Sequence, residues 1–293
     1  RPGRRRLGHG RRLTRAMVEF LDRVAAAEKA NKSLLCVGLD PDPGRLPGHL
    51  RGEPDGIYRF CKEIVDATHD LVLAFKPQIA YFAAQGAEEQ LRRLIAYIHD
   101  STEIPVILDA KRADIASTSK MYAREAFEIY GADALTVNPY FGLDSLQPFL
   151  DYQDKGIIIL CRTSNPGGAE IQNITTMDGV PIYEVVARKA AREWNRHGNI
   201  LLVAGATHPG ELARIREIVG GMTLLIPGVG AQGGEVAAMI ESARGGGVII
   251  SSSRAVIFAG GDRNFADAAR QAAMATRNFI NDALHAICDD IRA

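Results

Sequence analysis

The feature that most constrains this chain is a repeated alternation of short apolar runs with longer amphipathic segments. The apolar runs are rich in valine, isoleucine and leucine, as expected of strands that are buried on both faces of a parallel sheet. Their lengths suit strands rather than helices. We find eight such runs, at residues 33–39, 71–75, 106–109, 134–137, 156–160, 200–203, 223–226 and 248–251.

Each run is followed by a segment with helical spacing of apolar residues, and one further helix precedes the first run. Eight strand–helix units in 293 residues fit a barrel better than a doubly wound sheet, which has fewer strands and a glycine-rich first turn. We therefore predict an α/β fold, a single (β/α)8 TIM barrel with an extra N-terminal helix. The predicted helices span 18–30, 57–69, 87–99, 115–130, 143–152, 182–196, 209–219, 235–243 and 265–287.

Composition narrows the classes of partner. Lys plus Arg equals Asp plus Glu, 35 of each, so no overall field favours nucleic acid or a membrane surface. No apolar run approaches the roughly 18–20 residues needed to cross a bilayer. The four cysteines are scattered without a C-x-x-C motif, so we expect neither a zinc site nor a disulfide framework, and we expect a cytoplasmic protein. They are Cys36, Cys61, Cys161 and Cys288.

The first twelve residues are rich in arginine and free of acids, but they lack the apolar core of a secretory signal. No linker or shift of composition marks a second domain. Our hypothesis is that residues 1–16 are a basic extension outside the fold and that residues 17–293 form one barrel domain.

The chemistry concentrates where the third strand ends. Asp109, Lys111 and Asp114 lie within six residues of one another directly after an apolar run. Alternate side chains of a strand share a face, so Asp109 and Lys111 should project together. Alone, this D-x-K-x-x-D pattern is also compatible with an edge-strand ion pair followed by an Asp helix cap.

Polar residues also follow the other predicted strands, and the carboxyl ends of barrel strands form the active-site face. Lys76 ends strand two and shares a face with small or apolar neighbours, although such a lysine is often a solvated surface group. Asp40 precedes a proline, so it is also compatible with a turn residue that has no part in binding. Asn138 follows strand four, and Ser164 follows strand five.

A glycine-rich turn follows strand seven and precedes a helix. Glycines allow backbone N–H groups to approach an oxyanion, and the start of a helix adds a positive dipole end. The loops after strands seven and eight are the usual phosphate site of such barrels, and an arginine after strand eight could bind the dianion. The expected phosphate-binding residues are Gly228, Gly230, Gly233, Gly234 and Arg254.

Taken together, these motifs resemble the orotidine 5′-phosphate decarboxylase family, in its longer bacterial branch, the type 2 subfamily. The resemblance rests on Asp109-Ala-Lys111-Arg-Ala-Asp114 with Thr118 four residues later, and on the segments 75–78, 163–167 and 227–230. It covers roughly residues 17 to 285. It implies decarboxylation of orotidine 5′-phosphate to uridine 5′-phosphate and CO2 in pyrimidine biosynthesis, without a metal or an organic cofactor.

The resemblance also implies roles. Lys76, Asp109, Lys111 and Asp114 match the charged network, in which Lys111 would stabilise a carbanion at C6 of the pyrimidine and protonate it. Asp114 and Thr118 would reach the neighbouring subunit's site in a homodimer. By the same resemblance, Asp40 would bind the ribose and Ser164 would hydrogen-bond the pyrimidine. Gln232 and Arg254 would bind the phosphate, and Asn138 would line the pocket.

Two alternatives stay open. A magnesium-dependent sugar-phosphate lyase or decarboxylase of the same superfamily shares D-x-K-x-x-D, but it is expected to carry an acidic ligand where this chain has Lys76. A non-catalytic barrel that binds phosphate ligands would not need two lysines interleaved with carboxylates, because such a cluster is costly to desolvate.

Overall fold

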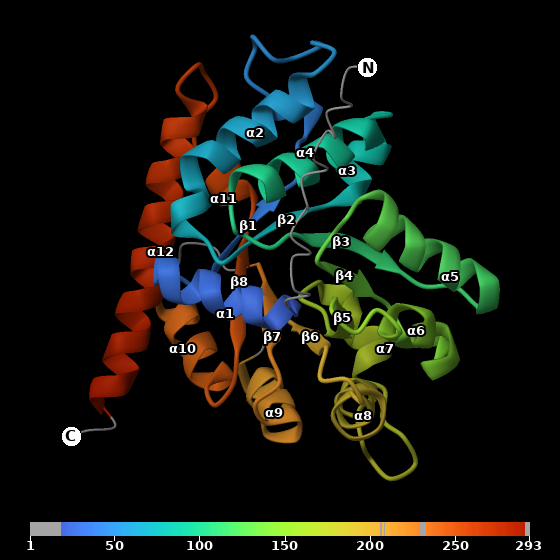
Figure 1. The fold of residues 1–293 in the computed structure, drawn as a ribbon. Helices are drawn as coiled ribbons and strands as arrows, with labels where there is room; N and C mark the ends of the chain where they lie inside the picture. Colours follow the sequence, from blue (N-terminus) through green and yellow to red (C-terminus); the bar gives the residue numbers. More distant parts are fainter. Residues whose placement is uncertain (1–18, 206, 208, 229–232, 291–293) are drawn as a thin grey trace, which may run out of the picture.

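The computed structural model describes residues 19–205, 207, 209–228 and 233–290, so the proposed extension at residues 1–16 lies outside the described part. Eight parallel strands surround a common axis (Figure 1). The alternation in the sequence therefore predicted the fold correctly. The strands are β1 (Leu35–Leu39), β2 (Ala74–Pro77), β3 (Ile107–Arg112), β4 (Ala134–Val137), β5 (Gly156–Arg162), β6 (Ile200–Ala204), β7 (Leu224–Pro227) and β8 (Val248–Ser252).

The sheet curls into a nearly closed barrel. Seven neighbouring pairs follow the order β2-β1-β8-β7-β6-β5-β4-β3. Between the two end strands, parallel bridges join Phe75 to Val106 and Gln78 to Asp109. The carboxyl ends of all eight strands consequently meet at one face, as the fold requires for a shared site.

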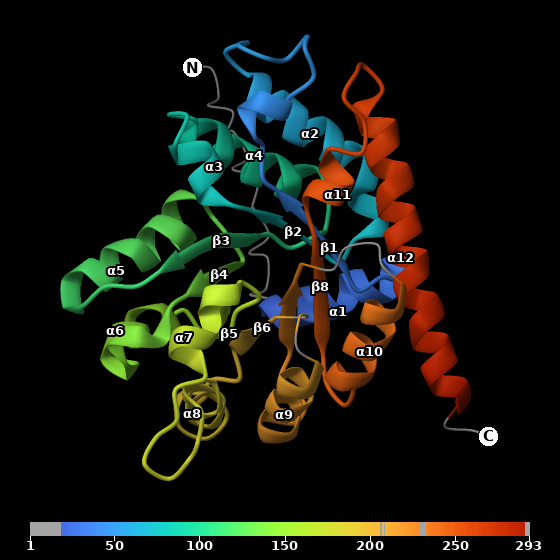
Figure 2. The ribbon, with the colours of Figure 1, turned by 180° about the vertical axis from the view of Figure 1, so that it is seen from behind.

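Helices cover the outside of the barrel in the predicted order (Figure 2). No helix in the described part of the chain is long and apolar enough to cross a membrane. The longer helices are α1 (Phe20–Asn31), α2 (Gly56–Thr68), α4 (Glu88–Ser101), α5 (Ala116–Arg124), α6 (Leu143–Leu150), α8 (Ile182–Lys189), α9 (Pro209–Val219), α10 (Gly233–Ala243) and α12 (Phe265–Asp290).

Several short elements were not predicted because each is a single turn or two, too brief for a periodic pattern. π-helical turns continue two of the predicted helices, at η3 (Glu125–Ile129) and η6 (Ala190–Trp194). The others are η1 (Pro43–Arg45), η2 (His69–Leu71), α3 (Ile79–Ala83), η4 (Pro139–Phe141), η5 (Pro166–Gly168), α7 (Ala169–Gln172) and α11 (Arg254–Ile257).

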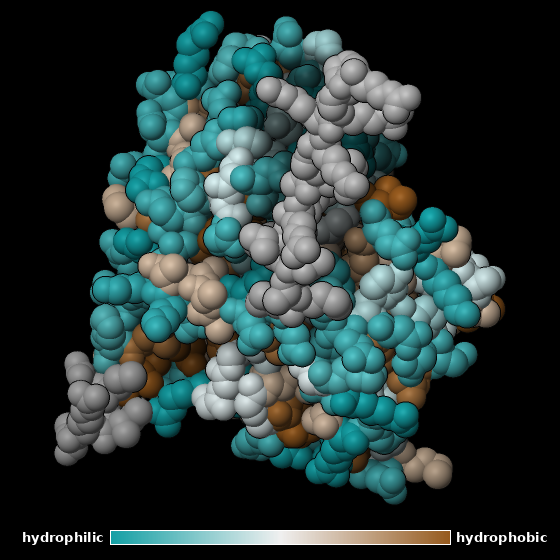
Figure 3. Space-filling model, in the orientation of Figure 1, coloured by the Kyte–Doolittle hydropathy of each residue, from teal (hydrophilic) through white to brown (hydrophobic). Residues whose placement is uncertain are grey.

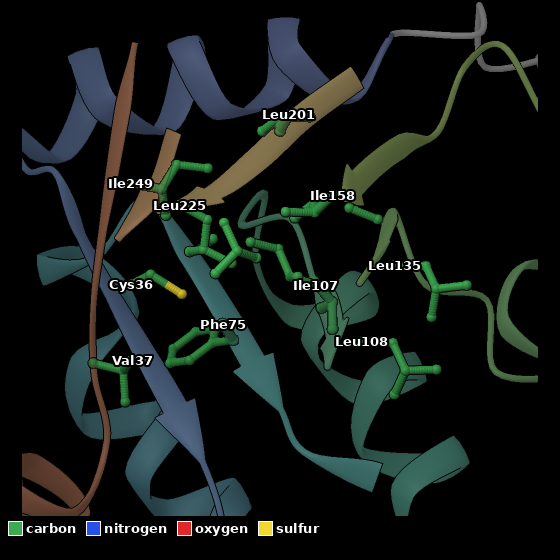
Figure 4. Packing of buried hydrophobic residues seen from close by; sticks show 14 of the residues in the cluster. Cys36, Val37, Phe75, Ile107, Leu108, Leu135, Ile158, Leu201, Leu225 and Ile249 are labelled. Atoms are coloured by element: carbon green, nitrogen blue, oxygen red, sulfur yellow. The ribbon is translucent and has the colours of Figure 1, made fainter. Parts of the chain in front are cut away.

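The barrel interior is filled by side chains from every side. The pairing register places Ile158, Leu201, Leu225, Ile249 and Cys36 on the inner face of successive strands, and Figure 4 shows these side chains gathered between the strands. All are almost fully buried. This apolar layer closes the barrel beneath the polar residues at the strand ends.

Helix α1 covers the opposite, amino-terminal end of the barrel. The ring of Phe20 lies so close to Gly156 that a β-carbon there would be 2.4 Å from it. Beside it, the buried Asp133 accepts hydrogen bonds from Arg23, from Nε2 of His99 at 2.7 Å and from the backbone N–H of Val106 at 2.8 Å. Helix α1 is thus packed against this end of the barrel. Polar side chains dominate the face of the molecule that Figure 3 shows.

Candidate active site

A chain of alternating charges lies at the carboxyl ends of β2 and β3. Nζ of Lys76 donates to Oδ2 of Asp109 at 2.9 Å, and Nζ of Lys111 donates to Oδ1 of Asp109 at 2.7 Å. Lys76 and Asp109 are buried, whereas about half of the Lys111 side chain is exposed. One carboxylate thus holds two ammonium groups, one fixed in the protein and one facing outward.

The backbone of β3 departs from regular pairing where Lys111 lies. Its register with β4 shifts between Leu108 and Arg112, and Lys111 has a φ of 47°, in the left-handed region. Such a conformation costs a non-glycine residue on the order of 1 kcal/mol. The simple strand alternation that we expected fails here, yet the bulge still brings Lys111 to Asp109.

Thr136 supports this bulge, and our sequence reasoning missed it. Its hydroxyl donates to Oδ1 of Asp109 at 2.9 Å and accepts the backbone N–H groups of Ala110 and Lys111, each at 2.9 Å. The side chain is 1% exposed. The sequence shows only that Thr136 is the one polar side chain in the otherwise apolar run of β4.

The charges in this cluster stabilise one another. Burial alone would raise the pKa of Asp109, but Lys76 and Lys111 outweigh it and lower that pKa to about 2. Burial would likewise lower the pKa of Lys76, but Asp109 and Asp40 raise it above its ordinary value. At neutral pH the Lys76–Asp109 pair is therefore fully ionised.

Asp40 lies after β1 with one oxygen bound and one free. Oδ2 accepts the hydroxyl of Ser253 at 2.6 Å, while Oδ1 is buried and has no hydrogen-bond partner among the described residues. Gly38 permits this arrangement because a β-carbon there would lie 2.7 Å from Cβ of Ser253. A buried carboxylate oxygen with unused capacity suits a ligand hydroxyl.

A cavity of about 560 Å³ opens beside these groups, between the ends of β1, β2, β5, β7 and β8. It meets the charged cluster through Lys76, which both lines the cavity and binds Asp109. A larger hollow of about 820 Å³ lies where α1, α10 and α12 meet, and none of the predicted site residues lines it. The site cavity is lined by Asp40, Arg45, Lys76, Ser164, Pro227, Gly228, Ser251, Ser252, Ser253, Arg254 and Ala255.

Some of the predicted phosphate-binding residues lie in the described part of the chain and others do not. Gly228 has a φ of 84°, which favours glycine, and its N–H donates to the carbonyl of Ser251. Gly233 and Gly234 begin α10, and Arg254 begins α11 with an exposed side chain at the cavity. Gly230 and Gln232 lie outside the described residues.

Ser164 is held at the cavity by the end of β6. A β-carbon on Gly205 would lie 2.9 Å from Cα of Ser164, so only glycine permits this approach. The preceding Thr163 is fixed by Gln172, whose Oε1 accepts the Thr163 N–H at 2.9 Å. The loop after β5 is thus anchored by its own side chains.

Two predicted residues, Asp114 and Thr118, form no hydrogen bond or ion pair with this cluster in the described part of the chain. Thr118 is exposed on α5, and the Asp114 carboxylate accepts the N–H of Ile115 at 2.8 Å. None of the ion pairs found in the described chain joins Asp114 to Lys111. Asn138 also turns to a local partner, because its Oδ1 accepts the N–H of Tyr140 at 3.0 Å and caps η4.

Comparisons with known proteins give one consistent result. The model of the orotidine 5′-phosphate decarboxylase / HUMPS family matches residues 33–269. Orotidine 5′-phosphate decarboxylase of Aromatoleum aromaticum is 59% identical over 268 residues, covering 90% of this chain and 99% of the relative. That of Dechloromonas aromatica is 59% identical over 266 residues, covering 89% and 98%. The structure of Leishmania donovani OMP decarboxylase has a TM-score of 0.78 at 37% identity and covers 91% of this chain and 98% of that one.

Proposed function

The chain belongs to the orotidine 5′-phosphate decarboxylase family, and from this premise we propose how its residues divide the work. The enzyme decarboxylates orotidine 5′-phosphate to uridine 5′-phosphate and CO2 in pyrimidine biosynthesis. Loss of CO2 leaves an electron pair on C6 of the pyrimidine, where no π system delocalises it well. Stabilisation must then come from fixed charge.

Lys111 is the proposed source of that charge and of the proton. Its ammonium is half exposed and lies 2.7 Å from Oδ1 of Asp109. As the C6–carboxylate bond breaks, the electron pair stays on C6, and an N–H of Lys111 transfers its proton there. The neutral amine then regains a proton from solvent. The bulge at Lys111, stabilised by Thr136, fixes the direction of approach.

Asp109 and Lys76 are proposed to hold Lys111 charged and oriented. A carboxylate favours the ammonium form of its neighbour, and Asp109 stays ionised because its pKa is about 2. Lys76 shares that carboxylate from the buried side, so Asp109 cannot rotate without losing a charged hydrogen bond. The cluster is therefore arranged before the substrate arrives, which is what makes electrostatic stabilisation effective.

The remaining predicted roles follow the shape of the cavity. The unpartnered Oδ1 of Asp40 would accept a ribose hydroxyl, and Ser164 would hydrogen-bond the pyrimidine. Gly228, Gly230, Gln232, Gly233, Gly234 and Arg254 would bind the phosphate. This grip is remote from the bond that breaks, so its binding energy can be used to align the base.

We also propose a homodimer in which Asp114 and Thr118 reach the partner's site. Helix α5 extends beyond the barrel in both ribbon views (Figures 1 and 2). Arg112 binds Glu125 through two hydrogen bonds of 3.1 Å, which tie the end of β3 to η3, the continuation of α5. Exposed apolar side chains at the start of α5, on α5 itself and in η4 support a self-complementary interface. These are Ile115, Met121, Tyr140 and Phe141.

A cytoplasmic location is part of the proposal. The free, buried thiols of Cys36, Cys61 and Cys161 support it, because disulfides are rare in a reducing compartment.

The observation that carries the proposed mechanism is the shared carboxylate of Asp109 between Lys76 and Lys111. It also weighs against the magnesium-dependent lyase, since a metal ion at Asp109 would be repelled by the Lys76 ammonium. The test is to follow the loss of orotidine 5′-phosphate absorbance after exhaustive chelation. Full activity supports the proposal, whereas activity that disappears and returns with magnesium would favour the lyase.

A further inference from the structure

Arg45 lines the same cavity as Arg254, although no motif singled it out. It ends η1, in the loop after β1, while Arg254 begins α11, directly after β8. Strands β1 and β8 are hydrogen-bonded neighbours, so the two arginines come from adjacent loops at the active-site face. Both therefore approach the end of the cavity where phosphate binding is proposed.

The Arg45 side chain rests on an aromatic platform. Its guanidinium carbon lies 4.2 Å from the ring centre of Phe258, a favourable distance for a cation over an aromatic face. The ring of Phe258 is itself stacked on the buried Phe60, with ring centres 5.4 Å apart and planes 18° apart. The guanidinium is thus held in place by packing that reaches into the core.

The backbone that carries Arg45 is fixed as well. The N–H of Arg45 donates to the carbonyl of Asp42 at 2.9 Å, and the Asp42 side chain accepts the N–H of Gly44 at 2.9 Å. Nη2 of Arg51 donates to the carbonyls of Gly44 and Leu46 at 3.2 and 3.0 Å. Because the loop is already ordered, a ligand that binds to it incurs little cost in conformational entropy.

Arg45 has no acidic partner in the described part of the chain. The ion pairs found there leave it out, and the nearby Asp42 carboxylate is engaged by the Gly44 N–H. An ordered guanidinium that lines a cavity without a counter-ion is suited to an anion from outside the chain.

We infer that Arg45 is a second phosphate-binding cation, which together with Arg254 matches the two negative charges of the 5′-phosphate. The phosphate of a nucleotide carries about −1.5 to −2 charges at neutral pH, so one arginine leaves it under-neutralised. This inference rests on the proposed function only for the identity of the nucleotide. Arg45 is expected to contact the phosphate and not the nucleoside.

Binding of uridine 5′-phosphate and of uridine, measured by calorimetry, separates these contributions. In Arg45→Met, the affinity for uridine 5′-phosphate should fall about 5- to 20-fold, the range expected for a charged hydrogen bond at an exposed site. The affinity for uridine should stay unchanged. Arg45→Lys should recover part of the loss, because lysine keeps the positive charge but cannot make the paired hydrogen bonds of a guanidinium.

Arg92→Met is the matched control, because it removes an exposed arginine whose partner is Glu89 on α4, away from the cavity. It should leave both affinities unchanged. Equal affinities for uridine 5′-phosphate in the wild type and in Arg45→Met would overturn the inference. So would an equal loss for nucleotide and nucleoside, which would indicate that Arg45 only shapes the loop. Failure of the wild type to turn over orotidine 5′-phosphate would instead overturn the proposed function, with the binding comparison still deciding the role of Arg45.

Discussion

Asp109 and Asp133 are buried carboxylates at opposite ends of the barrel, and each is held by two basic side chains. Burial would raise the pKa of both, and their partners lower both pKa values instead. The surroundings differ. The two basic partners of Asp133 are mostly buried, with 14% of the Arg23 side chain and 22% of the His99 side chain exposed, whereas 47% of the Lys111 side chain beside Asp109 is exposed. Arg23 borders a hollow of about 500 Å³, but no predicted site residue lines it, while Lys76 lines the cavity that Asp40 and Ser164 also line.

This difference distinguishes a structural charge network from the network that we propose to be reactive. A cation that is mostly buried in its ion pair, such as Arg23, stabilises the fold and presents little of its charge to a ligand. A half-exposed ammonium such as that of Lys111 can present its charge or its proton to a ligand. Low pKa and burial therefore do not identify a site by themselves, and access of the cation to a ligand does. Four comparisons of variants test this reading.

The largest contrast should come from removing each carboxylate in turn. Asp109→Asn should lower kcat about 10³-fold or more, because Lys111 loses its orienting charge. Asp133→Asn should leave kcat within about two-fold and lower the free energy of unfolding by about 2–3 kcal/mol, since Arg23 and His99 lose a charged acceptor. Steady-state kinetics and urea denaturation of both variants measure this. Loss of turnover in Asp133→Asn with unchanged stability would remove the distinction.

The next effect concerns the residues that the partner subunit is proposed to supply to the site. Asp109→Ala and Asp114→Ala should each lower activity about 100-fold or more when pure. Mixed dimers form with one intact site and one doubly defective site, so an equal mixture should regain about a quarter of wild-type activity. The activity of mixtures after subunit exchange gives the answer. If mixing recovers nothing while exchange is complete, Asp114 acts within its own subunit.

A smaller effect is expected at the bulge. Thr136→Val keeps the shape of the side chain but removes the hydroxyl that accepts the Ala110 and Lys111 N–H groups. We expect kcat to fall about 10-fold, because Lys111 is less well positioned. Thr68→Val is the control, since Thr68 is equally buried and donates only to the carbonyl of Ile64. Equal kinetics for the two valine variants would show that Thr136 has no part in placing Lys111.

The smallest effect is a change in the pH dependence of stability. The native pKa of Asp133 lies below that of the unfolded chain, so its contribution is present above pH of about 3.9 and is lost as the pH falls below that value. Unfolding free energies from about pH 6 to about pH 2 should decline less steeply in Asp133→Asn than in the wild type. Parallel curves would mean that Asp133 gains no stabilisation from Arg23 and His99.

Much of the fold and part of the site could be predicted from the sequence. Strand and helix periods are local properties, and barrel geometry then brings Lys76, Asp109 and Asp40 to one face. Thr136 was missed because threonine is an ordinary strand residue, and its role depends on a bulge that no local pattern encodes. The role proposed for Asp114 requires a partner subunit, so its prediction rested on family resemblance alone.

The central claim is that the exposed lysine of the Asp109 cluster delivers charge and proton to C6. The most direct test is the loss of orotidine 5′-phosphate absorbance with wild type and with Lys111→Ala, alongside calorimetry of uridine 5′-phosphate binding to both. We predict that Lys111→Ala still binds the nucleotide but turns over at least about 10⁴-fold more slowly than the wild type. Turnover by Lys111→Ala at the wild-type rate would contradict the account.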